Sequence, residues 1–238
     1  MRDITLSIVS HAQNALVNDL LVDIERTCAH GVSLVITQNV PDPNPLHSAA
    51  LSCPVRLIAN DRVKGFGTNH NAAFAHCRTT YFCVCNPDIR LQTDPFPAML
   101  AAMRTHTGVV GPLVRNPAGS VEDSARRFPT IASLAGRLFT DKRGPDYPTD
   151  QGTVEVDWIG GMFMLFKSND YRAIGGFDES YFLYYEDVDL CHRLRAAGRA
   201  VVYEPAAAVV HAAQRASRRN PALGWQHLKS ALRFLSRR

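Results

Sequence analysis

Three acidic residues stand close together in the stretch YYEDVDLCHRLRAAG, namely Glu186, Asp187 and Asp189. Acidic residues favour the first turn of a helix, because that turn carries the positive end of the helix dipole. If a helix begins near Glu186, Asp187 and Asp189 lie about 200° apart and cannot share one site. Asp189 can then pair with Arg193. Asp187 is left to face a cleft, where a carboxylate could act as a general base.

A second acid that could do chemistry is Asp88, in the stretch NPDIR, which directly follows an apolar run. A carboxylate at the end of a strand can help to hold Mg²⁺ or Mn²⁺, since both ions bind carboxylate and phosphate oxygens. The same Asn-Pro-Asp sequence is also typical of an ordinary turn. These residues alone leave both interpretations open.

The stretch NDRVKGFGTNHNAAF places Gly65 and Gly67 before a helix-like segment. Asp88 follows roughly 20 residues later, an arrangement similar to a dinucleotide-binding fingerprint. The third glycine position of that fingerprint is His70, which is too large for the close helix–strand packing required there. An NAD site is therefore disfavoured, and close approach of the backbone to a ligand at a helix start is the alternative.

The elements that must position these residues alternate between strand and helix patterns. Because most of the strands are apolar enough to be buried on both faces, the pattern predicts an α/β fold with a parallel sheet. Such sheets bind ligands at the carboxyl ends of their strands. The predicted strands span residues 4–9, 32–37, 55–59, 81–86 and 108–114, and a helix is expected over 69–76. The site candidates after the strands are Ser10, His11, Gln38, Asn39, Asn60 and Asn86 to Asp88.

The second half of the chain is less regular. Residues 115–153 are rich in Pro, Gly and Arg, and we interpret them as an insertion or a mobile loop region. A strand is expected in VDWIGGMFMLFK, where Gly160 and Gly161 indicate a bulge or the close approach of a ligand. A short helix with Ser168 as N-cap follows. After the acidic helix, which stops at Gly198, AVVYEP is the last predicted strand.

Composition and cysteine usage exclude several classes of protein. The 238 residues are 46% hydrophobic and 20% charged, which is ordinary for a globular protein. No apolar run approaches the roughly 18 residues that span a bilayer, and the first residues lack a signal-peptide cleavage site, so we expect a cytoplasmic protein. The six cysteines form no CxxC pair. We expect small buried hydrophobic side chains in a reducing compartment, and neither disulfides nor a zinc site.

The end of the chain is strongly basic. After Glu204 come seven positive residues and no negative one, although the whole chain carries only +4. Such a tail indicates an anionic partner. Trp225, Leu228, Leu232 and Leu235 lie near one helical face, as in a basic amphipathic helix that contacts anionic membrane. A helix that packs on its own domain or on a second subunit fits equally well. Nucleic-acid binding is disfavoured, because the body lacks alternating aromatic and basic residues.

The order of four stretches resembles the family 2 glycosyltransferases, and among them the bacterial rhamnosyltransferase-type enzymes of cell-surface polysaccharide assembly. The stretches are GFGTNHN, NPD after a strand, WIGGMFMLFKSNDYRAIGGFDESYFLYYEDVDLCHRLRAAG, and VVHAAQRAS, and the resemblance covers residues 4–215. It implies a GT-A fold, a nucleotide-diphosphate-sugar donor, a Mg²⁺ or Mn²⁺ ion and an inverting mechanism. The resemblance implies a glycosyltransferase domain at 1–212, followed by a basic amphipathic tail at 213–238. Within the domain, the nucleotide-sugar-binding half is 1–114 and the acceptor and catalytic half is 154–212.

The resemblance also assigns roles to residues. Asp88 matches the metal-binding Asp of the family's DxD-type motif, and Asp187 matches the general base of its ED motif. His211 matches a histidine that can complete the metal shell, although a lone histidine is often structural. The implied donor-binding set is Ser10, His11, Asn39, Asn60, Gly65, Gly67, Asn69, Asn86 and Asp88. The implied acceptor-binding set is Trp158, Gly160, Gly161 and Glu186.

Three positions depart from the family pattern, so the residues alone do not identify the base and the sugar of the donor. The first strand ends in SHAQN instead of a Thr-Tyr-Asn-like turn, Asn39 stands where an Asp commonly reads the base, and Asn86 replaces an acid. Asparagine can still donate to and accept from a pyrimidine edge. By resemblance we expect L-rhamnose from dTDP-rhamnose, with UDP-sugars as the other donor class, and a glycan or polyprenyl-diphosphate-linked acceptor.

Two other functions fit parts of the sequence. A nucleotidyltransferase would carry a glycine-rich basic loop near the first strand, which SIVSHAQN lacks. A non-catalytic nucleotide-sugar-binding homologue, or an inactive subunit of a glycosyltransferase complex, remains an alternative because of the departures at His11, Asn39 and Asn86.

Overall fold

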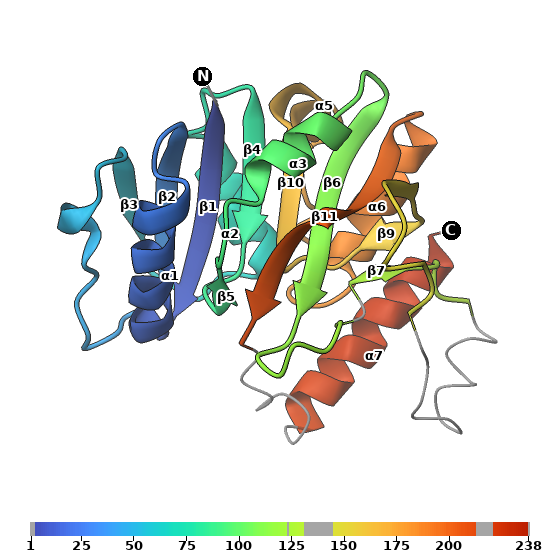
Figure 1. Ribbon diagram of the computed structural model, residues 1–238. Coiled ribbons are helices and arrows are strands. Elements are labelled where there is room, and N and C mark those ends of the chain that lie inside the picture. The colour runs from blue at the N-terminus through green and yellow to red at the C-terminus, as the bar shows by residue number, and fades with distance from the viewer. Residues whose placement is uncertain (1–2, 123, 131–144, 213–220, 238) are drawn as a thin grey trace.

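The computed structural model describes residues 3–122, 124–130, 145–212 and 221–237. A nine-stranded sheet runs through it in the order β3-β2-β1-β4-β10-β6-β11-β5, and β8 pairs with β11 (Figure 1). The strands are β1 (Ile4–His11), β2 (Val32–Val40), β3 (Val55–Ala59), β4 (Tyr81–Cys85), β5 (Ile89–Arg90), β6 (Thr107–Arg115), β8 (Val154–Glu155), β10 (Phe163–Lys167) and β11 (Ala200–His211).

The sheet contains the mostly parallel, helix-flanked part that the sequence predicted, and antiparallel strands join it. Strands β3, β2, β1 and β4 are parallel neighbours, and so are β6 and β11. Strand β10 lies antiparallel between β4 and β6. The pattern could not reveal this reversal, because a strand buried on both faces reads as a continuous apolar run in either direction.

The strand predicted through Gly160 and Gly161 is in fact broken at these glycines. Trp158–Ile159 form β9, which pairs with β7 (Ala125–Arg126) in a separate two-stranded sheet. Strand β10 begins only at Phe163. A Cβ atom at Gly160 would lie 2.8 Å from Cε of Met162, the end of a flexible side chain that can move aside. The prediction for Ser168 shifts by one residue, since Lys167 is the N-cap and Ser168 begins the helix.

Helices cover both faces of the sheet and enclose two main clusters of buried side chains. Side chains of β4 alternate between them, with Cys83 and Cys85 in one and Phe82 and Val84 in the other. All six cysteines are buried free thiols, as predicted. The helices are α1 (Asn14–Thr27), η1 (Ser48–Ala50), α2 (Phe66–Phe74), α3 (Phe96–Ala102), α5 (Ser168–Ala173), α6 (Glu186–Ala196) and α7 (Pro221–Ser236).

Helix α7 docks against the domain through one side. Ala231 and Phe234 are buried with Tyr181, Tyr185 and Val188 in a third apolar cluster. The helix therefore packs on its own domain, which was one of the two readings of the tail. The basic residues before it, Arg215, Arg218 and Arg219, lie outside the described residues.

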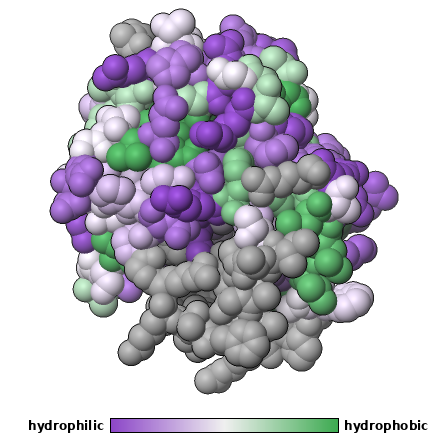
Figure 2. All heavy atoms as spheres, turned by 90° about the vertical axis from the view of Figure 1, so that its right-hand side faces the viewer, coloured by the Kyte–Doolittle hydropathy of each residue, from purple (hydrophilic) through white to green (hydrophobic). Residues whose placement is uncertain are grey.

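The rest of α7 faces outward, with Trp225, Leu228 and Leu232 exposed by 68%, 48% and 59%. No described helix combines the length and apolar character that a membrane span requires. Figure 2 views the right-hand side of Figure 1, where hydrophilic residues dominate and a hydrophobic patch lies beside them.

Candidate active site

A cavity of about 590 Å³ lies at the carboxyl ends of β1, β2 and β4, where the sequence predicted a ligand site. Its walls also include the start of α2, the 182–187 segment and Leu223 of α7. The predicted donor-binding residues that line it are His11, Asn39, Asn69, Asn86 and Asp88.

The other predicted donor residues lie behind this cavity and support its walls. Ser10 is buried, and its hydroxyl donates to Oδ1 of Asn14 at 2.7 Å. Asn60 donates to the side-chain oxygens of Asn39 and Asn69 at 2.9 and 2.7 Å. Their contribution is therefore to hold other side chains in place.

Gly65 and Gly67 do not line the cavity either. A Cβ atom at Gly65 would lie 2.7 Å from the backbone oxygen of Phe182, and one at Gly67 would lie 2.6 Å from Cβ of Phe177. Both glycines let α2 approach the 177–182 segment, so the close contact is with the chain itself. Phe66 N donates to Phe182 O at 2.9 Å across this contact.

Asn39 has no hydrogen-bonding capacity left for a nucleotide base. Its Nδ2 atom contacts Nδ1 of His11 at 3.1 Å and donates to Lys64 O at 2.9 Å. Its Oδ1 atom accepts from Asn60 Nδ2 at 2.9 Å and from Lys64 N at 2.8 Å. An asparagine amide offers two donor hydrogens and two lone pairs. Asn39 therefore orders the Lys64 segment at the cavity rim, and the predicted base-reading role loses its support.

The proposed metal residues come together although they are far apart in sequence. Strand β5 pairs with the end of β11, so that Ile89 is opposite His211. The Nε2 atom of His211 lies 3.2 Å from Oδ2 of Asp88, and Nδ1 lies 2.7 Å from Oε2 of Glu122. Burial opposes protonation of His211, but the Asp88 and Glu122 carboxylates outweigh it and raise the pKa of the imidazole.

Asp88 and His211 fit a divalent metal ion. Oδ1 of Asp88 is buried and has no hydrogen-bond partner within the described part of the chain. Carboxylate oxygen and imidazole nitrogen are both ligands that Mn²⁺ accepts. The described residues contain no cluster of three or more His, Cys, Asp or Glu side chains able to hold a metal on its own. The remaining ligands would have to be phosphate oxygens and water, which is the usual Mg²⁺ arrangement.

Two backbone hydrogen bonds orient the carboxylate of Asp187, the predicted general base. Its Oδ2 atom accepts from Gly161 N at 2.9 Å and its Oδ1 atom from Val188 N at 2.8 Å. Burial raises the pKa of this carboxyl, while these backbone hydrogen bonds oppose the rise. The side chain lies in the first turn of α6, where the helix dipole favours an anion. The predicted pairing of the other acid is confirmed, because Arg193 Nε lies 2.7 Å from Oδ2 of Asp189.

Glu186 has the opposite ionisation preference. Its side chain is buried, and burial together with the adjacent Asp187 carboxylate raises its pKa to about 8. Its Oε2 atom has no hydrogen-bond partner among the described residues. Glu186 therefore favours its protonated form at neutral pH, and the backbone hydrogen bonds at Asp187 favour the ionised form of that neighbour.

The turn before α6 is strained. Tyr184 and Tyr185 both adopt left-handed backbone conformations, with φ of 69° and 67°. Each such non-glycine residue costs on the order of 1–3 kcal/mol and is found mainly at functional sites. Here the turn directs Glu186 and Asp187 toward the cavity.

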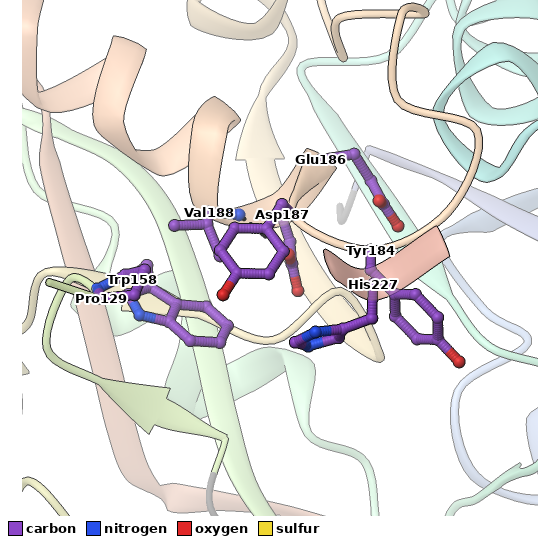
Figure 3. A pocket seen from close by; sticks show the side chains of 8 residues that line it. Pro129, Trp158, Tyr184, Glu186, Asp187, Val188 and His227 are labelled. Carbon is purple, nitrogen blue, oxygen red and sulfur yellow. Dashed lines mark hydrogen bonds between the residues drawn. The ribbon is translucent and has the colours of Figure 1, made fainter. Parts of the chain in front are cut away.

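A second, smaller pocket of about 140 Å³ adjoins the first. Trp158 and Glu186 of the predicted acceptor set line it, whereas Gly160 lines neither pocket, and its backbone N–H donates to Ser124 O at 2.7 Å. Figure 3 shows the Trp158 indole and the His227 imidazole on either side of this pocket, with Asp187 pointing into it.

Sequence reasoning missed several residues at these pockets. His70 lines the larger one, and its Nε2 atom is buried with no hydrogen-bond partner among the described residues. Lys64 could have been found as a cation in the glycine-containing stretch. Glu122 and His227 carry no sequence signal, because each reaches the site only through tertiary packing.

Comparisons with known proteins agree with this geometry. A family model described as "Glycosyltransferase like family 2" matches residues 47–230. The chain is 30% identical over 257 residues to N-acetylglucosaminyl-diphospho-decaprenol L-rhamnosyltransferase of Mycobacterium tuberculosis, covering 97% of this chain and 83% of that protein. It is 33% identical over 190 residues to rhamnosyltransferase WbbL of Escherichia coli K12, covering 74% and 72%.

Solved structures share the fold at low sequence identity. GalNAc-T7 with UDP, GalNAc and Mn²⁺ superposes with a TM-score of 0.68 at 10% identity, over 90% of this chain and 44% of that chain. The mannosyltransferase PcManGT from Pyrobaculum calidifontis, in complex with GDP-Man and Mn²⁺, gives 0.66 at 14% identity, over 98% and 65%. The fold is GT-A, as the sequence predicted. Because the family model spans most of the chain and two relatives reach 30% identity over most of their own length, the protein belongs to the family 2 glycosyltransferases.

Proposed function

We propose that this glycosyltransferase moves L-rhamnose from dTDP-rhamnose to a hydroxyl group of a polyprenyl-diphosphate-linked sugar in surface polysaccharide assembly, with inversion and with Mg²⁺ or Mn²⁺. The names of the two rhamnosyltransferase relatives support the sugar, and the name of the mycobacterial relative supports the acceptor class. The observation that carries the proposal is the position of Asp187, which lines both the larger cavity and the adjoining pocket. One carboxylate between two substrate sites suits a single displacement.

The larger cavity is the donor site in this proposal. Three polar atoms without hydrogen-bond partners among the described residues belong to residues that line it, namely His70 Nε2, Asp88 Oδ1 and Glu186 Oε2. Unpartnered buried polar groups are rare in folded proteins, and a bound polar ligand would satisfy them. Asp88 and His211 would hold the metal. When bound, that ion offsets the charge that develops on the leaving nucleotide diphosphate.

The adjoining pocket is then the acceptor site. Asp187 accepts the proton of the acceptor hydroxyl while the hydroxyl oxygen bonds to the anomeric carbon and the bond to the diphosphate breaks. Attack from the side opposite the diphosphate inverts the configuration. The hydrogen bonds from Gly161 N and Val188 N keep Asp187 oriented and ionised until the proton arrives. Protonated Glu186 avoids a second negative charge beside it.

Transfer assays test this function. The purified protein would be incubated with dTDP-L-rhamnose, Mn²⁺ and an N-acetylglucosaminyl diphosphate that carries a short alkyl chain. The expected product contains one added rhamnose by mass spectrometry and the inverted anomeric configuration by NMR. Retention of configuration would refute the mechanism. UDP-sugars tested in parallel would reveal a different donor class.

Nucleotide binding separates an enzyme from a non-catalytic homologue. A nucleotide present at about 100 times its Kd stabilises the folded state by about 2.7 kcal/mol. Thermal stabilisation by dTDP-rhamnose with Mn²⁺, without transfer to any acceptor, would favour the non-catalytic reading. Stabilisation together with transfer supports the enzyme.

Peripheral membrane contact through α7 is part of the proposal. The exposed Trp225, Leu228 and Leu232 lie beside Lys229 and Arg233, a combination that suits an anionic bilayer surface. Co-sedimentation with vesicles that contain anionic lipid tests it. Replacing the three apolar residues by serine should abolish sedimentation, and unchanged sedimentation would remove the idea.

A further inference from the structure

Helix α7 forms one wall of the pocket that contains the catalytic carboxylate. His227 of α7 lines this pocket together with Trp158, Tyr185 and Asp187 (Figure 3). In the sequence His227 is an isolated histidine in a basic tail. In the structure it shares a pocket with the proposed general base.

The helical repeat places His227 on the docking face of α7. Residues three, four and seven positions after it, Ser230, Ala231 and Phe234, are the buried ones among the described side chains of α7. At about 100° per residue these four positions share one face of the helix. His227 is nevertheless accessible to solvent, unlike the other three. It therefore lies on the docking face at a place where that face borders an open pocket.

The imidazole packs beside the turn that precedes α6. Its ring centre lies 5.3 Å from that of Tyr184 and 5.2 Å from that of Tyr185. One helical turn later, the Ser230 hydroxyl donates to Leu183 O at 2.9 Å. The turn that presents Asp187 and the helix that presents His227 are thus held together.

The pocket offers the groups that bind a sugar ring. Aromatic faces can pack on its C–H groups, while a few placed polar groups bind hydroxyls. From this geometry we infer that the pocket is the acceptor subsite and that His227 is an acceptor-binding residue, whose imidazole hydrogen-bonds a polar group of the acceptor sugar next to the hydroxyl that reacts. This inference rests on the proposed transferase function.

The opposite face of α7 indicates how the pocket would be oriented relative to a membrane surface. Trp225, Leu228 and Leu232 are the exposed apolar residues of the helix. With that face on a lipid surface, the inward face brings His227 to the head group of a lipid-linked acceptor. One helix would then serve both membrane contact and acceptor binding.

The test compares His227→Ala and His227→Asn with the wild-type protein. Loss of a hydrogen bond to a polar ligand removes about 1–2 kcal/mol, which is roughly a tenfold rise in the acceptor KM. The acceptor is the short-chain N-acetylglucosaminyl diphosphate. Hydrolysis of dTDP-rhamnose by water, and the Kd for dTDP, should stay unchanged because they need no acceptor. Asparagine should restore part of the lost affinity.

A matched control is His76→Ala, which removes an exposed histidine at the end of α2. Direct calorimetry of acceptor binding without donor keeps the inference separate from the transferase proposal. Weaker binding by His227→Ala supports the inference even if no transfer is detected. An unchanged acceptor KM and Kd, or an equal fall in hydrolysis and transfer, would overturn it. Absence of acceptor binding by the wild-type protein would overturn it as well.

Discussion

Glu186 and Asp187 are adjacent acids with different proposed protonation states, which predicts different effects when each is replaced by its amide. Burial and the adjacent Asp187 carboxylate raise the pKa of Glu186 to about 8, so that its protonated form is favoured at pH 7. Glu186→Gln therefore resembles the protonated glutamic acid in shape and charge, and its amide nitrogen provides a hydrogen-bond donor in the place of the protonated oxygen. We expect its turnover at pH 7 to fall less than about tenfold. Asp187→Asn removes the base, and should lower turnover by roughly 10²–10⁴-fold.

The same pKa predicts how stability depends on pH. Folded protein holds a proton on Glu186 that the unfolded chain releases above about pH 4.5, the ordinary value. Stability should therefore fall as pH rises from about 4.5 to about 8, with a slope of up to about 1.4 kcal/mol per pH unit. Between pH 5 and pH 7 the loss amounts to at most about 3 kcal/mol. Glu186→Gln removes this contribution.

Urea unfolding at both pH values, followed by circular dichroism, measures the effect. Glu179→Gln is the matched control, because it makes the same chemical change at an exposed side chain whose Oε1 atom accepts from Asn71 Nδ2, as a glutamine oxygen also can. The control should keep the wild-type pH dependence. The reasoning is refuted if Glu186→Gln loses as much turnover as Asp187→Asn, since Glu186 would then be the ionised base.

Four further outcomes are expected. Asp88→Asn should abolish the Mn²⁺ dependence of dTDP binding, measured by calorimetry. Glu122→Leu should weaken Mn²⁺ binding roughly 10–100-fold, because Glu122 orients His211, whereas Glu122→Gln should keep most of the affinity. Gly65→Ala should cost about 1–3 kcal/mol in urea unfolding, since its Cβ would lie 2.7 Å from a backbone oxygen. Asp23→Asn should cost about 3 kcal/mol at pH 7 and less in acid, because burial raises the pKa of Asp23 but the hydrogen bonds from Arg90, Leu91 N and Arg26 together outweigh it and lower the pKa.

The donor half of the fold could be predicted well because its signals are local. Apolar strands alternate with helices, and polar residues follow the strands where the cavity lies. His11, Asn86 and Asp88 were predicted in this way, and Asn69 was implied by the family resemblance. Asn39 also lines the cavity, but a sequence shows only that an amide is present and not that hydrogen bonds within the chain already occupy it.

The acceptor side was harder because its residues depend on long-range packing. The direction of β10 and the break at Gly160–Gly161 follow from pairing partners that the local pattern does not encode. Helix angles separated Asp187 from Asp189, yet Glu186 and Asp187 look equivalent in sequence. Gly161 N, from a distant segment, makes the difference by donating to Asp187 alone.

Several energetically unfavourable features lie at the two pockets. Tyr184 and Tyr185 occupy left-handed backbone conformations, while Asp88 and Glu186 bury oxygen atoms that have no hydrogen-bond partner in the described part of the chain. A fold selected only for stability would remove such features, since strain and unpartnered polar atoms each cost on the order of 1–3 kcal/mol. Their position gives them a use, because a metal ion, a diphosphate or a sugar hydroxyl would satisfy the oxygen atoms, and the strained turn keeps Asp187 between donor and acceptor. The free energy lost in the unliganded protein is then recovered as binding and orientation in the reacting complex.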